Sequence, residues 1–214
     1  MFTSFNALPN DPSDSQALPD TNPFGCAIGN DGDLYVSDGG DNGVWRVEEN
    51  GDSSMFVQFP GDPTVAGIAA LGMRREPRWR RGDHRADGLV VCLFGNGISG
   101  FANGSVQVAD RKGYHTLVPQ GVITMPIGAA YSPSGKLYIL QFATPNTRPG
   151  PPFAPGTGAI WSVSPTGAAT KVLGGLNWPT SICFGRDGTA YVSNNGILPA
   201  AGTPSGEVVK VTGL

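Results

Sequence analysis

Short apolar runs of strand length recur along the chain, and a turn containing glycine separates the members of each pair. Residues 23–38 read PFGCAIGNDGDLYVSD, and residues 179–194 read PTSICFGRDGTAYVSN. At this constant offset of 156 residues the proline, the Asp-Gly turn and the Tyr-Val-Ser run coincide. A third copy, PIGAAYSPSGKLYILQ, begins at Pro126. Each copy predicts a β-hairpin, because the turn glycine supplies the positive φ that the reversal requires.

A second recurring unit follows each hairpin. It reads GVWRVEENG at 43–51, GAIWSVSPTG at 158–167 and GEVVKVTG at 206–213, with a looser copy, GSVQVADRKG, at 104–113. Two successive hairpins give a four-stranded antiparallel sheet of about forty residues, which cannot bury both of its faces alone. The sheets must therefore stack on one another.

The unit starts predict the fold class. They fall at Pro23, Pro63, Pro126 and Pro179, which are 40, 63 and 53 residues apart. Four-stranded units at this spacing are typical of a β-propeller, in which each unit is one blade around a central axis. We predict one all-β domain over residues 1–214, with about four blades at 22–60, 61–124, 125–176 and 177–214.

The last unit stops after its third strand. The N-terminal segment FTSFNALP resembles the missing fourth strand, so residues 1–10 are expected either to close the last blade or to end a preceding one. The third unit carries a Pro/Gly-rich insertion, TPNTRPGPPFAPGTG, at 144–158, and the second carries an arginine-rich run between Met73 and Asp87.

Composition excludes several other classes of protein. Glycine (32) and proline (19) make up about 24% of the chain, which leaves no long stretch with helical periodicity. Glycine does not recur at every third position, so the chain is not collagen-like. Because 39% of the residues are hydrophobic, the chain is also too apolar for a disordered polymer.

Charge is unevenly distributed along the chain. The formal net charge is −3, residues 1–62 hold eleven acids and one base, and residues 73–87 hold six arginines and three acids. We interpret this basic run as a solvated loop or as non-native sequence, and the acidic remainder gives no basic face for nucleic acid. No apolar run is long enough to span a bilayer, and no export signal is visible at the N-terminus.

Three cysteines cannot all pair within one chain. Each of Cys26, Cys92 and Cys183 stands in an apolar run without a nearby histidine or second cysteine. We expect all three to be small buried hydrophobic residues. Cys26 and Cys183 are one position out of register in equivalent strands, so they should point to opposite faces of their sheets.

The repeats resemble those of a known family. NPFGCAIGNDGDLYVSDGGDNGVWRV, GKLYILQFA with the following Pro-rich loop, and LNWPTSICFGRDGTAYVSNNG are similar to ScyD/ScyE-type proteins. These are NHL-like six-bladed propellers associated with scytonemin biosynthesis genes, and they are commonly exported. The resemblance implies a six-bladed fold, a link to secondary metabolism and an extracellular or periplasmic location, but no defined reaction.

A metal-dependent lactonase of the gluconolactonase type is the alternative from another functional class. In that propeller family, Asn and Asp oxygens hold a divalent cation, which polarises an ester carbonyl and activates water. Where the family motif has Asn, this chain has Phe24, Ile127 and Thr180; where it has Asp, the chain has Asp38, Gln141 and Asn194. Only Asp38 matches. Asp38 is therefore the single candidate metal ligand. We expect no cofactor, and the alternative is Ca²⁺ or another divalent cation.

The same register predicts where a ligand would bind. Six residues should share one mouth of the propeller, namely Phe24, Asp38, Gln141, Thr180, Asn194 and Asn195. The insertion around Phe153 is apolar and rich in proline, which suits recognition of a protein or a small hydrophobic molecule. The sequence therefore favours a binding or scaffold protein, because no catalytic constellation is evident and function in propellers lies in loops.

Overall fold

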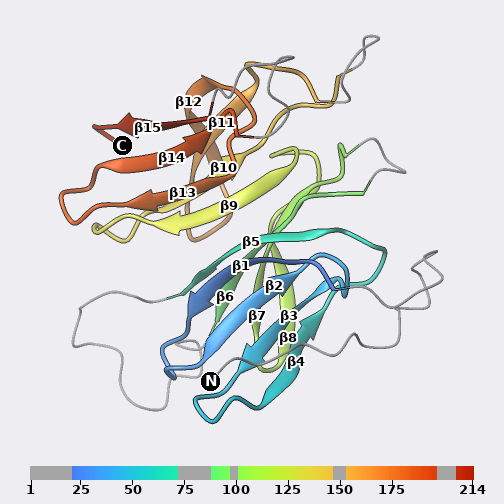
Figure 1. The fold of residues 1–214 in the computed structure, drawn as a ribbon. Coiled ribbons are helices and arrows are strands. Elements are labelled where there is room, and N and C mark those ends of the chain that lie inside the picture. Colours follow the sequence, from blue (N-terminus) through green and yellow to red (C-terminus); the bar gives the residue numbers. More distant parts are fainter. Residues whose placement is uncertain (1–20, 72–87, 97–100, 147–152, 197–205) are drawn as a thin grey trace.

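The computed structural model describes residues 21–71, 88–96, 101–146, 153–196 and 206–214, and its regular elements are all β-strands. The strands form four antiparallel sheets, which we call blades 1 to 4 in chain order (Figure 1). This confirms the predicted all-β propeller fold.

The strands follow one another in space as they do in sequence. Blade 1 contains β1 (Pro23–Ile28), β2 (Leu34–Asp38), β3 (Gly43–Val47) and β4 (Ser53–Gln58). Blade 2 contains β5 (Val65–Ala70), β6 (Leu89–Leu93), β7 (Ser105–Asp110) and β8 (Gly113–Val118). Blade 3 contains β9 (Pro126–Tyr131), β10 (Leu137–Gln141), β11 (Gly158–Val163) and β12 (Ala169–Leu176). Blade 4 contains β13 (Ser181–Phe184), β14 (Ala190–Asn194) and β15 (Glu207–Val211).

The hairpin turns lie where the glycine pattern predicts them. Gly32, Gly135 and Gly188 have φ values of 90°, 78° and 82°, so each is in the left-handed region that a side chain would strain. Each turn carries a glycine N–H bond to the carbonyl three residues earlier, such as Gly32 N to Gly29 O at 3.1 Å. The repeated turn chemistry therefore fixes the register of three blades.

The innermost strands β1, β5, β9 and β13 lie next to one another, so neighbouring blades meet at their inner edges (Figure 1). Small residues allow this close approach. A Cβ on Gly67 of β5 would lie 2.6 Å from the Cα of Gly128 in β9, and a Cβ on Gly128 would lie 3.5 Å from Cγ2 of Ile182 in β13. The distances at Gly128 are ordinary van der Waals contacts, whereas a Cβ at Gly67 would overlap the neighbouring backbone, so glycine at 67 is required by packing and not by a turn.

Apolar side chains fill the space between successive blades. Tyr35 of blade 1 packs in one cluster with Leu89 and Val91 of blade 2. Val90, on the other face of blade 2, packs in a second cluster with Ile139 of blade 3. A third cluster joins blades 3 and 4. The core is thus a series of layers between sheets, as stacking of the predicted units requires.

The outward faces of blades 1 and 4 each carry exposed apolar side chains. On blade 1 these residues are Phe24 (48% exposed) and Ile28 (51%), and on blade 4 they are Tyr191 (37%) and Val208 (69%). In the described part of the chain, no sheet covers either face.

This exposure corrects the prediction for two cysteines. Cys92 is fully buried, as predicted, and burial raises the pKa of its thiol. Cys26 and Cys183 are exposed, so their predicted burial was wrong. Their strands belong to the end blades, and both residues point away from the neighbouring blade.

Blade 4 has three described strands, in agreement with the sequence. The segment 1–10, predicted as a closing strand, and the basic run 73–87 lie outside the described residues. The Pro-rich insertion joins β10 to β11, and its described parts pair at Pro145 and Phe153. No helix in the described ranges has the length and apolar character needed to cross a membrane.

Candidate functional site

In every blade, the second strand ends and the third begins at the same end of the sheet. We call this end of the blades the loop face, and it is built in the same way in all four. There, the residue after the second strand donates its N–H to the carbonyl of a residue preceding the first strand. The four bonds are Gly39 to Asn22 (3.0 Å), Phe94 to Thr64 (3.0 Å), Phe142 to Met125 (3.0 Å) and Asn195 to Asn177 (2.7 Å). The repeat therefore places the predicted mouth residues on the loop face.

Asp38 ends the second strand of blade 1 and is fully buried. Its Oδ1 accepts three backbone N–H groups, from Asn22 at 2.7 Å, Gly40 at 2.9 Å and Asp41 at 3.1 Å. One carboxylate oxygen thus holds the strand start and the loop together. The other oxygen, Oδ2, is buried and has no hydrogen-bond partner among the described residues, and the same holds for both polar atoms of Asn42.

Gln141 occupies the equivalent position in blade 3 and is 2% exposed. Its Oε1 accepts a hydrogen bond from Nε1 of Trp161 at 2.8 Å, and its Nε2 donates to the carbonyls of Ala143 and Thr157 at 3.2 and 3.3 Å. The amide therefore anchors both ends of the Pro-rich insertion and the neighbouring strand.

Asn194 is the third equivalent residue, 5% exposed. Its Oδ1 accepts the N–H of Asn177 at 2.8 Å, and its Nδ2 donates to Glu207 Oε1 at 2.7 Å. Each hydrogen bond described for Asp38, Gln141 and Asn194 stays within one blade. These side chains fix the local structure of the loop face, and their role as ligand-binding residues remains a prediction.

The other predicted mouth residues are less enclosed. Phe24 lies on the outward face of blade 1 and is exposed. Thr180 is half-buried and donates its N–H to Ser193 O at 3.0 Å. Asn195 is half-buried with φ 57°, in the left-handed region that asparagine tolerates best among residues with a side chain.

A cluster of four phenylalanines on the loop face is the feature that the sequence did not predict as a whole. Phe94 and Phe142 are the residues directly after the second strands of blades 2 and 3, so the repeat brings them to equivalent places. Phe101 comes from the β6–β7 connection, and Phe153 comes from the Pro-rich insertion. Two connections, β6–β7 of blade 2 and β10–β11 of blade 3, therefore contribute to one aromatic surface, which we call the phenylalanine cluster.

Phe153 touches all three other rings. Its centroid lies 5.2 Å from Phe142, 5.3 Å from Phe101 and 6.4 Å from Phe94. Phe94 lies 5.6 Å from both Phe101 and Phe142. The interplanar angles of 55–82° are tilted or edge-to-face arrangements, which aromatic pairs prefer.

The burial of the cluster leaves part of it accessible. Phe142 is 3% exposed and belongs to the core, whereas Phe94, Phe101 and Phe153 are half-buried. Of the four, only Phe153 was noted from the sequence as a recognition residue. Phe94 and Phe142 could have been found by reading one position past Asp38 in the aligned repeats, where two blades carry phenylalanine.

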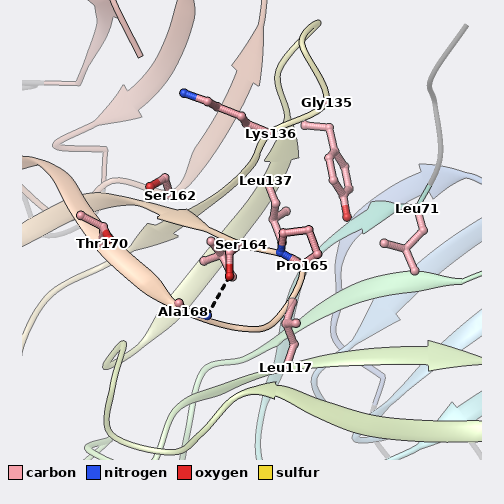
Figure 2. A pocket seen from close by; sticks show the side chains of 12 residues that line it. Leu71, Leu117, Gly135, Lys136, Leu137, Ser162, Ser164, Pro165, Ala168 and Thr170 are labelled. Atoms are coloured by element: carbon pink, nitrogen blue, oxygen red, sulfur yellow. Dashed lines mark hydrogen bonds between the residues drawn. The ribbon is translucent and has the colours of Figure 1, made fainter. Parts of the chain in front are cut away.

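A hollow of about 540 Å³ lies at the opposite end of blades 2 and 3 (Figure 2). Its lining is mainly apolar, with Leu71 and Leu117 from blade 2 and Leu137 and Pro165 from blade 3. In Figure 2 the amine of Lys136 points away from the other lining side chains. This hollow is remote from the residues that the repeat brings to the loop face.

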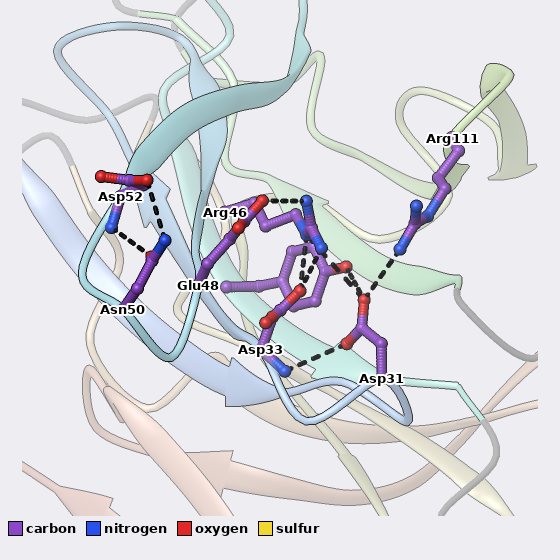
Figure 3. A network of polar contacts seen from close by, with 8 residues as sticks. Asp31, Asp33, Arg46, Glu48, Asn50, Asp52 and Arg111 are labelled. Carbon is purple, nitrogen blue, oxygen red and sulfur yellow. Dashed lines mark hydrogen bonds and ion pairs between the residues drawn. The ribbon is translucent and has the colours of Figure 1, made fainter.

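A polar network joins the turns of blades 1 and 2 (Figure 3). Asp31 Oδ2 accepts the Tyr35 hydroxyl at 2.8 Å and lies 3.2 Å from Nη2 of Arg111 on blade 2, while Arg46 contacts both Asp33 and Glu48. Burial alone would raise the pKa of Asp31, but hydrogen bonds from Tyr35, the Asp33 N–H and Arg111, with the charge of Arg46, lower it overall. The network therefore stabilises the ionised carboxylate and ties two blades together.

Comparisons with known proteins give structural but not sequence relatives. No family model matches the chain, and no curated protein sequence matches it significantly. Among solved structures, a chain in a nidogen/laminin complex is similar with a TM-score of 0.59 and 16% identity, over 82% of this chain and 58% of that one. A gluconolactonase from Xanthomonas campestris is similar with a TM-score of 0.59 and 18% identity, over 89% of this chain and 58% of the gluconolactonase.

A streptogramin B lyase is similar with a TM-score of 0.55 and 15% identity, over 91% of this chain and 56% of the lyase. The likeness shows the fold alone. It is the β-propeller fold, and the four blades match part of six-bladed propellers. The chain spans less than three fifths of the length of each of these three structures.

Proposed function

We propose that this protein binds a partner through apolar contacts on its loop face, with the phenylalanine cluster as the contact surface. The observation that carries the proposal is the convergence of four phenylalanines from two loops of neighbouring blades, namely Phe94, Phe101, Phe142 and Phe153. Aromatic rings bury large areas at low entropic cost, and such residues dominate binding energy at interfaces.

The partner that best fits the cluster is a peptide segment of a protein with an exposed aromatic or aliphatic side chain. The half-buried rings pack on the buried Phe142 and give such a side chain an apolar contact surface on rigid support. The nidogen/laminin complex supports a protein partner, because a similar propeller occurs there in a protein complex. A link to secondary-metabolite genes and an extracellular or periplasmic location rest on the family resemblance alone and stay predictions.

Peptide selection on the full chain tests this proposal. Peptides from a random displayed library should be enriched in aromatic and aliphatic residues, and their affinity is measured by calorimetry. We expect Phe153→Ala to weaken binding about tenfold or more, because it removes the ring that contacts the other three. Thermal melts confirm that the variant remains folded.

Phe56→Ala is the matched control, since Phe56 is a half-buried ring in blade 1 that contacts Tyr35 and not the cluster. It should leave the affinity unchanged. Equal affinities for wild type and Phe153→Ala would contradict the proposal.

The lactonase alternative has less support. Asp38 Oδ2 and Asn42 Oδ1 are buried oxygens without a partner among the described residues, and oxygen is the donor that Ca²⁺ accepts. Two side-chain oxygens are few for an ion that takes about six to eight ligands. The described residues also contain no group of three or more His, Cys, Asp or Glu side chains that could hold a metal. The residues present therefore do not fit a catalytic metal centre.

A calcium titration followed by thermal melting separates the two candidates. The binding proposal predicts no calcium-dependent rise in melting temperature. Asn42→Gly removes the unpaired amide and keeps the backbone φ of 53° without strain. A calcium-dependent rise in the melting temperature of the wild type that is absent in Asn42→Gly would favour the metal-dependent enzyme.

A further inference from the structure

A second cavity lies between the linker that follows blade 1 and the outer strands of blade 2, with a volume of about 600 Å³. Phe59, Pro60 and Pro63 line it on the linker side, and Gln107, Tyr114 and Thr116 line it on the strand side. Its size is within the range of about 300–1,000 Å³ typical of small-molecule sites. The residues that line it include no charged side chain.

Gln107 gives this cavity an unsatisfied polar group. The residue is 5% exposed and its Nε2 donates to Ser105 Oγ at 2.9 Å, but its Oε1 is buried without a partner among the described residues. A buried acceptor left unpaired costs about 1–3 kcal/mol. A hydroxyl or amide donor on a ligand would satisfy this oxygen.

Tyr114 supplies an aromatic platform. Its ring is 43% exposed and lies 4.7 Å from the buried ring of Phe59, which supports it from behind. Thr64, next to Pro63, has φ 51°, a conformation that is costly for a β-branched residue and persists only where packing imposes it. The linker wall is therefore held in one conformation.

We propose that this cavity binds a neutral saccharide. A sugar ring presents a face of C–H groups that packs on an aromatic ring, here Tyr114, and hydroxyl groups that donate to an acceptor such as Gln107 Oε1 and accept from polar side chains such as Thr116. Because no charged side chain lines the cavity, an ionic ligand would lose its hydration without gaining a counter-charge. The site is separate from the phenylalanine cluster, so its test is independent of the function proposed above.

Ligand-observed NMR on the full chain tests the saccharide site. The probes are glucose, galactose, mannose, N-acetylglucosamine and cellobiose, each at millimolar concentration. At least one should show saturation transfer, and a titration gives its Kd. Tyr114→Ala and Gln107→Leu should each weaken binding about tenfold, through loss of the platform and of the acceptor respectively.

Tyr191→Ala is the matched control, because Tyr191 is similarly exposed (37%) but lies on blade 4. It should bind like the wild type, and glucose 6-phosphate should bind no more tightly than glucose. Circular dichroism confirms the fold of each variant. Absence of saturation transfer from all five sugars, or equal losses in Tyr114→Ala and Tyr191→Ala, would overturn the proposal.

Discussion

Buried polar side chains on the loop face act on the backbone around them. Asp38, Gln141 and Asn194 end equivalent strands, yet each bonds a different set of groups, because the loops that follow differ in length and sequence. Where the strand ends, the hydrogen bonds between strands also end. A polar side chain at this position pairs backbone groups of the loop that would otherwise have no partner.

Gln141→Leu should therefore be clearly destabilising. The substitution leaves the indole N–H of Trp161 and two carbonyls without their partner, and such a loss costs about 1–3 kcal/mol of unfolding free energy. Gln107→Leu is the control: it also replaces a buried glutamine, but one whose amide oxygen has no partner among the described residues. Chemical denaturation of both variants measures the difference, and equal losses would contradict this role for Gln141.

The Asp31 network should make stability depend on acid pH. The pKa of Asp31 is lower in the folded protein than its ordinary value, despite the opposing effect of burial. Its stabilising contribution is therefore fully present above the unfolded pKa of about 3.9 and is lost as the pH falls through the folded pKa. Asp31→Asn should melt at a lower temperature than the wild type at pH 6. The two melting temperatures should converge at the lowest pH.

The exposed Glu49 provides a control for this experiment. In Glu49→Gln, the difference in melting temperature between neutral and acid pH should be close to that of the wild type. If Asp31→Asn melts at the wild-type temperature at every pH, the network does not stabilise the fold.

At the scale of elements, the sequence predicted the hairpins well because their turn chemistry is local. Gly32, Gly135 and Gly188 need a positive φ, and this requirement is visible in a repeat alignment. The exposure of Cys26 and Cys183 could not be predicted in this way, since the pattern within a strand does not show which blades have a neighbour on each side.

The contact between β5 and β9 depends on Gly67. A Cβ there would lie 2.6 Å from Gly128 Cα, and backbone cannot move aside as a flexible side chain can. Gly67→Ala should reduce the free energy of unfolding by about 1–3 kcal/mol or more, as overpacking does. Gly174→Ala should be nearly neutral, because the nearest atom to its Cβ is Lys171 Cδ at 3.9 Å. Denaturant unfolding of the two variants measures the loss of unfolding free energy in each. Similar losses would contradict the packing account.

At the scale of the whole molecule, stacked blades bring distant loops together. The phenylalanine cluster draws on Phe94, Phe101, Phe142 and Phe153, which span 60 positions of the chain. The repeat pattern predicted that the loop face would hold a ligand site, and it placed Phe153 in a recognition loop. It could not predict the cluster, because ring contacts between blades depend on loop conformations that no local rule determines.

The central claim, that the phenylalanine cluster is a binding surface, is tested most directly by NMR of the full chain labelled on its phenylalanine rings. Resonances are assigned by single Phe→Leu substitutions, and a peptide selected on the protein is titrated in. The account predicts saturable shifts for Phe94, Phe101 and Phe153, with the resonance of Phe56 unmoved. Saturable binding that moves Phe56 and leaves those three rings unchanged would contradict it.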